Sequence, residues 1–318
     1  MATHAQRHGI RRTSSNSFEF TGTVNGAVNP GRGEVWYVNT QSAANGNGKS
    51  WDQPFTTMAA ALAAAGTNDT IQFVGDVREE LVGSNLVFDL TIIGMGTSPH
   101  HPDLPAAGYN VGAACWRPPA SPTAATPLIK VRGRGWRFVN ILFDCPVDAA
   151  AIYLERNALS GTSEYDASHA SIYDCRFDAG LVGIENAGGC GFVTVSGNRF
   201  RGLTESGGAG IKCTSTSVAV PLMWTIEGNH FHNNASHILS SMSYSTIRDN
   251  VFGRFTATLS IDIDDQPSAN QGEYNVITRN YLSGTYGATA YPPGATGTNE
   301  WGGNNGSLTG GTTAADPA

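Results

Sequence analysis

Acidic side chains on one face of the predicted strands are the residues whose types and spacing could do chemistry. Glu155, Glu185, Asp262 and Asp264 fall on three of these strands. Hydrolysis of a glycosidic bond needs two carboxyl groups about 5 to 10 Å apart, and neighbouring strands lie about 4.8 Å apart. These four residues are therefore the candidate acid, base or nucleophile if the chain is an enzyme. In the alternative, Glu185 and Lys212 are an exposed ion pair across two strands, and the aspartates belong to a solvated turn.

A pair of histidines, His230 and His232, is the second candidate for chemistry. They flank Phe231 in the run HFHNNASH, so both imidazoles point outward if Phe231 points inward. Two imidazoles on one face could hold a metal ion, particularly where several chains meet. A single His-x-His is also typical of ordinary surface histidines. We therefore expect no bound metal and no other cofactor.

A repeat of the form Ile-x-x-Asn-x-Phe must position these residues. It occurs as VSGNRF (195–200), IEGNHF (226–231), IRDNVF (247–252) and ITRNYL (277–282), with a degenerate copy, IYDCRF, at 172–177. A constant core with loops of variable length is typical of a solenoid. We expect the Ile and Phe positions to point inward and the asparagines to stack as an internal ladder. Each asparagine would sit at a bend with left-handed backbone, which Asn tolerates. The ladder residues are Asn198, Asn229, Asn250 and Asn280.

A second short strand follows each copy after a variable loop. The strands are AIYLE (151–155), GIEN (183–186), GIKCT (210–214), HILS (237–240) and SIDID (260–264). Alternation places the isoleucines inward and their successors outward. One outward column is then Tyr153, Glu185, Lys212, Leu239 and Asp262, and the column beside it is Glu155, Ala187, Thr214, Ser241 and Asp264. The pattern predicts an all-β chain with seven to nine coils of a parallel β-helix between about residues 70 and 283.

Four further segments lie within or beside the predicted solenoid of residues 35–283. An Ala-rich segment at about 55–66 begins at a threonine and stops at Gly66, which predicts a short helix that caps the open N-terminal end of the stack. Residues 1–34 form a polar arm with no sustained period, in which Arg7, Arg11 and Arg12 are candidate attachment residues. The loop at about 97–126 is too long for a mere connector, and residues 284–318 are a Gly-rich tail.

Composition narrows the function classes. The 318 residues carry a net charge of −7, with 16 Arg and only 3 Lys. A general nucleic-acid binder needs a basic surface, so that class is disfavoured. No stretch approaches the roughly 18 apolar residues of a membrane span, and the N-terminus lacks the apolar core of a secretory signal. The 5 cysteines have no CxxC spacing, which predicts buried, reduced thiols in a chain that folds in a cytoplasm.

The sequence resembles right-handed parallel β-helix proteins of the pectate lyase and phage tailspike type over about residues 35 to 283. WYVNTQSAANGNGKSWDQPFTTMAAALAAA, DTIQFVGDVREELVGSNLVFDLTIIGMG and the Ile-x-x-Asn-x-Phe copies carry the resemblance. The stretch from IIGMG to WRFVNILF further resembles β-helix proteins encoded among phage structural genes. Of the motifs of polygalacturonase-like enzymes, only an Asp-Asp pair (Asp264 and Asp265) is present. No clustered calcium-binding carboxylates with a basic residue, as in pectate lyases, stand out.

Two functions follow from the resemblance and the residues. The first is a non-catalytic structural or adhesive virion protein, as a head decoration or tail-associated component, attached through a terminal segment. It would be made in a host cytoplasm and assemble as a homotrimer with other virion proteins. A surface glycan would be a possible ligand, and neither membrane nor specific nucleic acid would be a partner. The alternative is a polysaccharide depolymerase, a hydrolase or lyase of the tailspike type; the missing catalytic motifs favour the first function.

Overall fold

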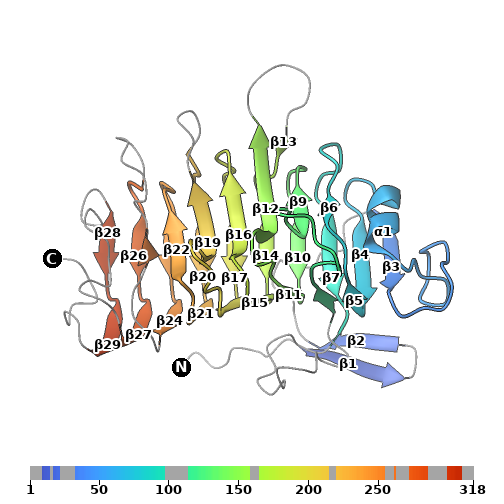
Figure 1. Ribbon diagram of the computed structural model, residues 1–318, viewed down its shortest axis with the longest axis horizontal. Coiled ribbons are helices and arrows are strands. Elements are labelled where there is room, and N and C mark those ends of the chain that lie inside the picture. Colours follow the sequence, from blue (N-terminus) through green and yellow to red (C-terminus); the bar gives the residue numbers. More distant parts are fainter. Residues whose placement is uncertain are drawn as a thin grey trace.

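Short β-strands stacked in layers make up most of the computed structural model (Figure 1). It describes residues 9–14, 17–21, 33–96, 114–157, 165–214, 220–254, 261–262, 272–285 and 299–309. Within these ranges the chain has one helix, α1 (Met58–Ala64). The strands follow one another along the long axis of the molecule in sequence order, from α1 at one end to β28 and β29 at the other (Figure 1).

Three parallel sheets run along this axis. Sheet 1 contains, in spatial order, β3 (Val35–Asn39), β4 (Thr70–Val74), β7 (Thr91–Gly94), β10 (Arg137–Val139), β14 (Ser171–Tyr173), β17 (Thr194–Ser196), β20 (Thr225–Glu227), β23 (Thr246–Arg248), β26 (Val276–Thr278) and β28 (Glu300–Gly302). Sheet 2 contains β5 (Asp76–Val77), β8 (Cys115–Trp116), β11 (Leu142–Asp144), β15 (Arg176–Asp178), β18 (Arg199–Arg201), β21 (His230–His232), β24 (Val251–Arg254), β27 (Tyr281–Thr285) and β29 (Asn305–Thr309). Sheet 3 contains β6 (Leu81–Val82), β9 (Ile129–Val131), β12 (Ala150–Asn157), β16 (Val182–Ala187), β19 (Ala209–Thr214), β22 (Ser236–Ser240) and β25 (Ile261–Asp262), and β13 (Tyr165–Asp166) pairs antiparallel with β12.

Each coil contributes one strand to each sheet and then returns to the first, one layer further along. The strands of one coil, such as β14, β15 and β16, therefore pair with β17, β18 and β19 of the next, always in parallel. Parallel crossovers of this kind are almost always right-handed. The predicted right-handed parallel β-helix is confirmed.

Like side chains stack on one another in the core. Phe143, Phe177, Phe200, Phe231 and Phe252 form a continuous stack, with neighbouring ring centroids 4.7 to 5.0 Å apart. All five are buried. Each buried phenylalanine contributes about 1.5 to 3 kcal/mol, so this stack sets the register of sheet 2 and fixes which neighbouring side chains point outward.

The repeat asparagines form a buried ladder in the turn between sheets 1 and 2. The Oδ1 of Asn229 accepts from the backbone N and from Nδ2 of Asn198, at 2.9 and 3.0 Å. The same pair of bonds recurs from Asn229 to Asn250 and from Asn250 to Asn280. Asn280 makes it in turn with Asn304, which extends the ladder by one residue that the repeat did not predict.

The left-handed residue of this turn precedes the asparagine. The positive φ angles belong to Asp174, Gly197, Gly228, Asp249, Arg279 and Gly303. The expectation that each ladder asparagine adopts left-handed backbone is therefore wrong. The position needs Asn because its amide is an acceptor and a donor inside the turn, where the backbone groups would otherwise have no partner.

The solenoid extends further than the repeat predicted. β28 pairs with β26 and β29 with β27, and Trp301 takes the position opposite Ile277. The boundary at residue 283 is therefore too early. The predicted loop 97–126 likewise contains β8, whose Trp116 is buried and whose strand belongs to sheet 2.

The N-terminal segments also carry regular structure. β1 (Gly9–Ser14) and β2 (Ser17–Thr21) pair as an antiparallel hairpin within the predicted arm, where no strand was expected. α1 begins after Thr57, whose side chain caps the helix by accepting from Ala60 N. Met58 and Ala61 are buried in the main core. That α1 caps the stack stays a prediction.

Candidate functional site

The predicted outward column lies on sheet 3 in the predicted order. Tyr153, Glu185, Lys212, Leu239 and Asp262 occupy the same register position on successive strands, and Lys130 precedes Tyr153. Glu155 lies two residues beyond Tyr153, opposite Ala187, and Thr214 follows in the same row. Ser241 follows β22, and its backbone N donates to Cys213 O. Asp264 and Asp265 lie outside the described residues.

Glu185 in this column and Glu155 in the row beside it are both paired with cations. The Oε2 of Glu155 lies 2.5 Å from Arg132 Nε, and its Oε1 lies 4.0 Å from Lys130 Nζ. Glu185 Oε1 lies 3.8 Å from Lys212 Nζ. The carboxylates are thus held in ion pairs with 21 to 22% side-chain exposure. The structure brings the two candidates onto neighbouring strands, but each of them is paired with at least one cation.

Glu185 keeps one property of a general acid. Burial raises its pKa, and Lys212 opposes that shift only in part. Burial and the charges of Glu185 and Glu155 also raise the pKa of Tyr153, which lies between them. A carboxyl group with a raised pKa can hold a proton nearer to neutral pH. Among the acids whose side chains the structure describes here, Glu185 is therefore a candidate to donate a proton to a leaving group.

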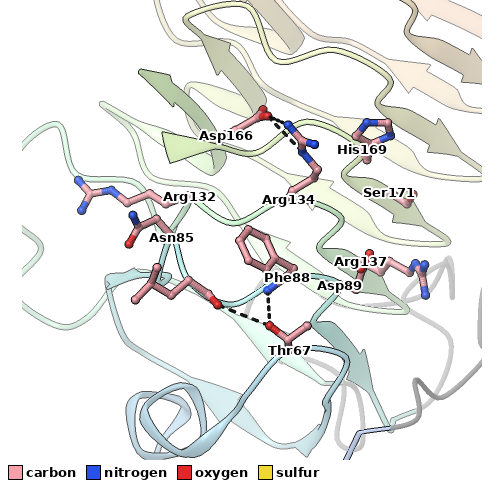
Figure 2. A pocket seen from close by; sticks show the side chains of 11 residues that line it. Thr67, Asn85, Phe88, Asp89, Arg132, Arg134, Arg137, Asp166, His169 and Ser171 are labelled. Carbon is pink, nitrogen blue, oxygen red and sulfur yellow. Dashed lines mark hydrogen bonds and ion pairs between the residues drawn. The ribbon is translucent and has the colours of Figure 1, made fainter. Parts of the chain in front are cut away.

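A groove lies beside this column, at the turn that leads from sheet 3 into sheet 1 (Figure 2). Its volume is about 1170 Å³, and we name it the arginine groove. It is lined by Thr67, Asn85, Leu86, Phe88, Asp89, Arg132, Arg134, Arg137, Asp166, His169 and Ser171. Arg132 belongs to both surfaces, because it also pairs with Glu155. These residues come from four coils, and no local motif marks them. The sequence analysis therefore missed the groove.

The acids of the groove are poor candidates for acid catalysis. Asp166 is ion-paired with Arg134 and accepts from the backbone N of Ser168 at 2.9 Å. Burial would raise the pKa of Asp166, but these bonds outweigh it and lower the pKa. Asp166 therefore stays ionised at the pH where a general acid needs a proton. Asp89 is exposed and lies to the right of Phe88 in Figure 2.

Arg137 is the cation of the groove that is free to meet a ligand. No ion pair joins it to a carboxylate among the residues that the structure describes. Its side chain extends away from the Arg134–Asp166 pair (Figure 2). An arginine fork matches the two oxygens of a carboxylate. The groove can thus bind an acidic group without altering its own ion pairs.

Exposed bulky side chains continue from the groove along the edge of sheet 1. They share one position, two residues before each strand, and we name them the edge strip: His169, Phe192, Met223, Tyr244 and Tyr274. His169 and Phe192 stack with centroids 4.8 Å apart, and Tyr244 and Tyr274 with centroids 5.0 Å apart. Four steps of roughly 4.8 Å give the strip a length of about 19 Å.

Every residue of the edge strip has left-handed backbone, with φ between 54° and 63°. Positive φ is a marked outlier for bulky side chains, and strain of this kind is found most often at functional sites. The earlier coils place Asn68, Asp89 and Gly135 at the same position, which are residue types that tolerate it. Phe192, Met223, Tyr244 and Tyr274 are each 48 to 56% exposed, so burial does not offset the strain.

A row of hydroxyl groups runs beside the strip. Ser171, Thr194, Thr225 and Thr246 occupy one register position of sheet 1, two residues after the strip positions. An apolar strip beside a row of donors and acceptors matches a sugar chain, whose rings have apolar C–H faces and hydroxyl rims. The edge strip and the hydroxyl row can therefore bind an extended glycan. Neither of them contains an acidic residue.

The two candidate metal ligands lie on sheet 2, away from this surface. His230 and His232 flank the buried Phe231 as expected. Their register partners are Arg199 and Arg201. Burial lowers the pKa of both histidines, and the neighbouring arginines lower it further. Among the described residues no group of three or more His, Cys, Asp or Glu could hold a metal ion.

The attachment candidates are only partly described. Arg7 lies outside the described residues. Arg11 and Arg12 lie on β1, opposite Glu19 and Phe18 of β2. Glu19 is therefore the register partner of Arg11, a pairing that the sequence analysis did not expect. Across the described chain, no helix is long and apolar enough to cross a membrane.

Comparisons with known proteins return parallel β-helices. The chain is similar to a PL6 family alginate lyase, AlyGC, at 16% identity and a TM-score of 0.40, covering 81% of this chain and 40% of the lyase. It is similar to the pectate lyase Pel9A at 13% identity and a TM-score of 0.44, covering 90% and 78%. It is also similar to the tailspike protein of E. coli bacteriophage HK620 in complex with a pentasaccharide, at 12% identity and a TM-score of 0.41, covering 87% and 59%. The chain thus spans less than two thirds of the alginate lyase and of the tailspike.

No protein-family model matches the sequence, and no curated protein matches it. At these identities and TM-scores the similarities concern the fold alone. The fold assignment itself rests on the strand pairing.

Proposed function

We propose that this right-handed parallel β-helix is a non-catalytic component of a phage particle that binds a surface glycan along the arginine groove and the edge strip. The observation that carries the proposal is the edge strip, because five successive coils place a bulky, exposed side chain at a strained backbone position. An exposed apolar patch with a polar rim is the mark of a binding surface. The pentasaccharide named with the phage tailspike of similar fold agrees with this class of ligand.

The glycan that fits is acidic. Arg137 can hold a carboxylate at the groove end, while the strip contacts apolar faces of the following sugars and the hydroxyl row contacts their rims. On a body of net charge −7, the free arginine restricts where such a polyanion can bind. We further propose the assembly that the sequence suggested: a homotrimer on the virion, attached to other virion proteins through a terminal segment, as a head decoration or tail component.

We propose that the protein does not cleave the glycan, because its candidate acids Glu155 and Asp166 are paired with arginines. Glu155 and Asp166 are held by arginines, so neither presents a free carboxylate beside a second one. The competing function is a depolymerase, and one observation favours it: the raised pKa of Glu185 beside Tyr153. A hydrolase or lyase would use Glu185 as its acid. Asp262 and Asp264 would remain further candidates under that function.

Calorimetric titration with capsular polysaccharide purified from the host bacterium tests the binding proposal. The double variant Phe192→Asn/Tyr244→Asn removes two rings of the strip and should weaken binding at least about tenfold, since buried aromatic contacts dominate many interfaces. Tyr281→Asn is the matched control, because Tyr281 is 44% exposed on sheet 2, away from the strip. Equal affinity of the double variant and the control would refute the strip as the binding surface.

Arg137→Gln tests the charge preference in the same titration. It should weaken binding of an acidic polysaccharide and leave binding of its carboxyl-reduced form unchanged, because only the charge contact is lost. The control is Arg279→Gln, an exposed arginine that is paired with Asp249. If both variants bound the acidic polymer like the wild type, the glycan would have to contact another part of the chain.

A further inference from the structure

The outer face of sheet 2 carries four basic side chains outside the site already described. Arg199 and Arg201 on β18 lie in register with His230 and His232 on β21. Phe200 and Phe231, between them, point into the core, so the four side chains share the outer face. We name these four residues the cationic patch; β21 lies along the lower edge of the molecule in Figure 1.

The acids around the cationic patch do not balance it. On the β15 side, Arg176 faces Arg199 and Asp178 faces Arg201. Asp178 is already engaged by Arg176, whose Nε and Nη2 lie 2.9 and 2.5 Å from its carboxylate oxygens. Asp144 lies one strand further away, opposite Asp178. On the other side, β24 presents Val251 and Gly253, which carry no charge.

The arginines of the patch differ from exposed and half-buried arginines elsewhere on the molecule. Arg132, Arg134, Arg248 and Arg279 are each paired with a carboxylate. No ion pair joins Arg199 or Arg201 to an acid within the described residues. Like charges opposite one another on neighbouring strands are destabilising. Burial, Arg176 and Arg201 accordingly lower the pKa of Arg199.

We propose that the cationic patch is a binding site for a tetrahedral oxyanion with two negative charges, of the phosphoryl or sulfate kind. Guanidinium forks donate in pairs to such oxygens, and the imidazoles of the next strand supply further N–H donors. The anion relieves the repulsion between Arg199 and Arg201. This site is independent of the proposed glycan surface, because the patch is on sheet 2 and the edge strip borders sheet 1.

Binding should be coupled to protonation of the histidines. Without an anion, burial and the arginines lower the pKa of His230 and His232, so both are neutral at neutral pH. A bound dianion favours their charged forms and raises both pKa values. Affinity should therefore increase as the pH falls from about 8 to about 5.5, with protons taken up on binding.

Isothermal titration with inorganic phosphate and with sulfate, at constant ionic strength set with chloride, tests the site. We expect one saturable site per chain; the pH dependence is measured with sulfate, which stays a dianion throughout this range, and should show tighter binding and proton uptake at lower pH. Arg199→Gln/Arg201→Gln should weaken binding at least about tenfold, since two charge-assisted contacts are lost. His230→Gln should reduce the increase in affinity at low pH and leave the affinity at high pH unchanged. Arg279→Gln should bind like the wild type.

A sugar phosphate monoester and a sugar sulfate, titrated in parallel, identify the source of the anion. Preference for the phosphate assigns the site to phosphoryl groups, and preference for the sulfate assigns it to sulfated ligands. Heat signals no larger than those of chloride would overturn the site. Equal weakening by Arg279→Gln would also overturn it, because the effect would then reflect net charge alone. Thermal unfolding of each variant checks that it is folded.

Discussion

The ladder asparagines connect the coils through amide groups that have no access to water. Asn229 accepts two bonds from Asn198 and donates from Nδ2 to Val195 O at 2.9 Å. In Asn229→Val the backbone N of Asn198 and the O of Val195 lose these partners while buried. We expect a loss of about 2 to 4 kcal/mol of unfolding free energy in chemical denaturation. Asn305→Val, at an exposed strand position, should change it little, and equal stability of both variants would contradict the ladder.

The edge strip makes the opposite prediction for stability. Asn adopts left-handed backbone more easily than Phe or Tyr, so Phe192→Asn and Tyr244→Asn should leave the melting temperature unchanged or raise it. The same substitutions should weaken glycan binding. Such a gain in stability with a loss of binding is expected where strain is kept for function. A clear drop in melting temperature would show that these rings stabilise the fold.

At the scale of residues, the sequence predicted where the ladder asparagines lie but not why each position needs Asn. The Ile-x-x-Asn-x-Phe spacing locates four ladder residues, yet Asn suits a left-handed turn and a buried hydrogen bond alike. The Gly and Asp residues that precede several asparagines, such as Gly197 and Asp249, were the available signal for the left-handed position. The strip position lies three residues before the first residue of each Ile-x-x-Asn-x-Phe copy, so a constant spacing marked it, and the sequence analysis missed it because it considered only the residues within each copy.

At the scale of elements, Asp69 joins the end of α1 to β3. Its carboxylate accepts from the backbone N of Glu34 at 2.7 Å, from Trp36 Nε1 at 2.8 Å and from Gly66 N at 2.7 Å. Burial would raise the pKa of Asp69, but these bonds and Lys49 outweigh it and lower the pKa. The stabilisation is therefore present above the unfolded pKa of about 3.9 and is lost as the pH falls through the lower folded value.

Asp69→Asn should lower the unfolding free energy by about 1 to 3 kcal/mol at neutral pH. The difference from the wild type should shrink at an acidic pH below about 3.9, because the stabilisation is lost as the pH falls toward the lowered folded pKa of Asp69. Chemical denaturation at the two pH values measures this. Asp52→Asn, at an exposed position near α1, is the control. A difference that stays constant with pH would mean that the charge of Asp69 is not responsible.

The last described coil should stabilise the stack that precedes it. Ending the chain after Thr285 removes β28 and β29 and uncovers Ile277 and Leu282, which are fully buried. Exposure of two such side chains costs about 3 to 6 kcal/mol. A chain that ends after Thr309 keeps both strands and is the control. Equal stability of the two truncated chains, measured by chemical denaturation, would contradict the role of this coil.

This coil also shows why the sequence placed the end of the solenoid too early. Trp301 stands where other coils have Ile, and Gly306 faces Leu282. This copy, WGGNNG, therefore has neither the Ile nor the Phe of the motif and keeps only Asn304. The register of β28 and β29 is set by their pairing with β26 and β27 of the previous coil, because the motif is lost in this copy. The same applies to the arginine groove, whose residues from four coils meet only after the coils stack.

At the scale of the whole molecule, attachment is proposed to depend on residues 1–34. The solenoid strands and α1 all lie downstream of this arm, so deletion of residues 2–34 should leave a folded protein whose circular dichroism spectrum changes only by the loss of β1 and β2. Incorporation into particles should be lost, and raised salt should weaken docking of the full chain if the arginines contribute. Imaging particles with a labelled antibody measures incorporation. Normal incorporation of the truncated chain would transfer attachment to another part of the molecule.

The central claim is that the β-helix binds a glycan without cleaving it, and product analysis of the bound polymer tests this most directly. Host capsular polysaccharide is incubated with excess protein, and new reducing ends, unsaturated uronates and chain length are followed over time. We predict saturable binding with no new ends and no shortening, because the candidate acids Glu155 and Glu185 are held in ion pairs. Rapid shortening of the polymer that disappears in Glu185→Gln would contradict this and identify the protein as a depolymerase.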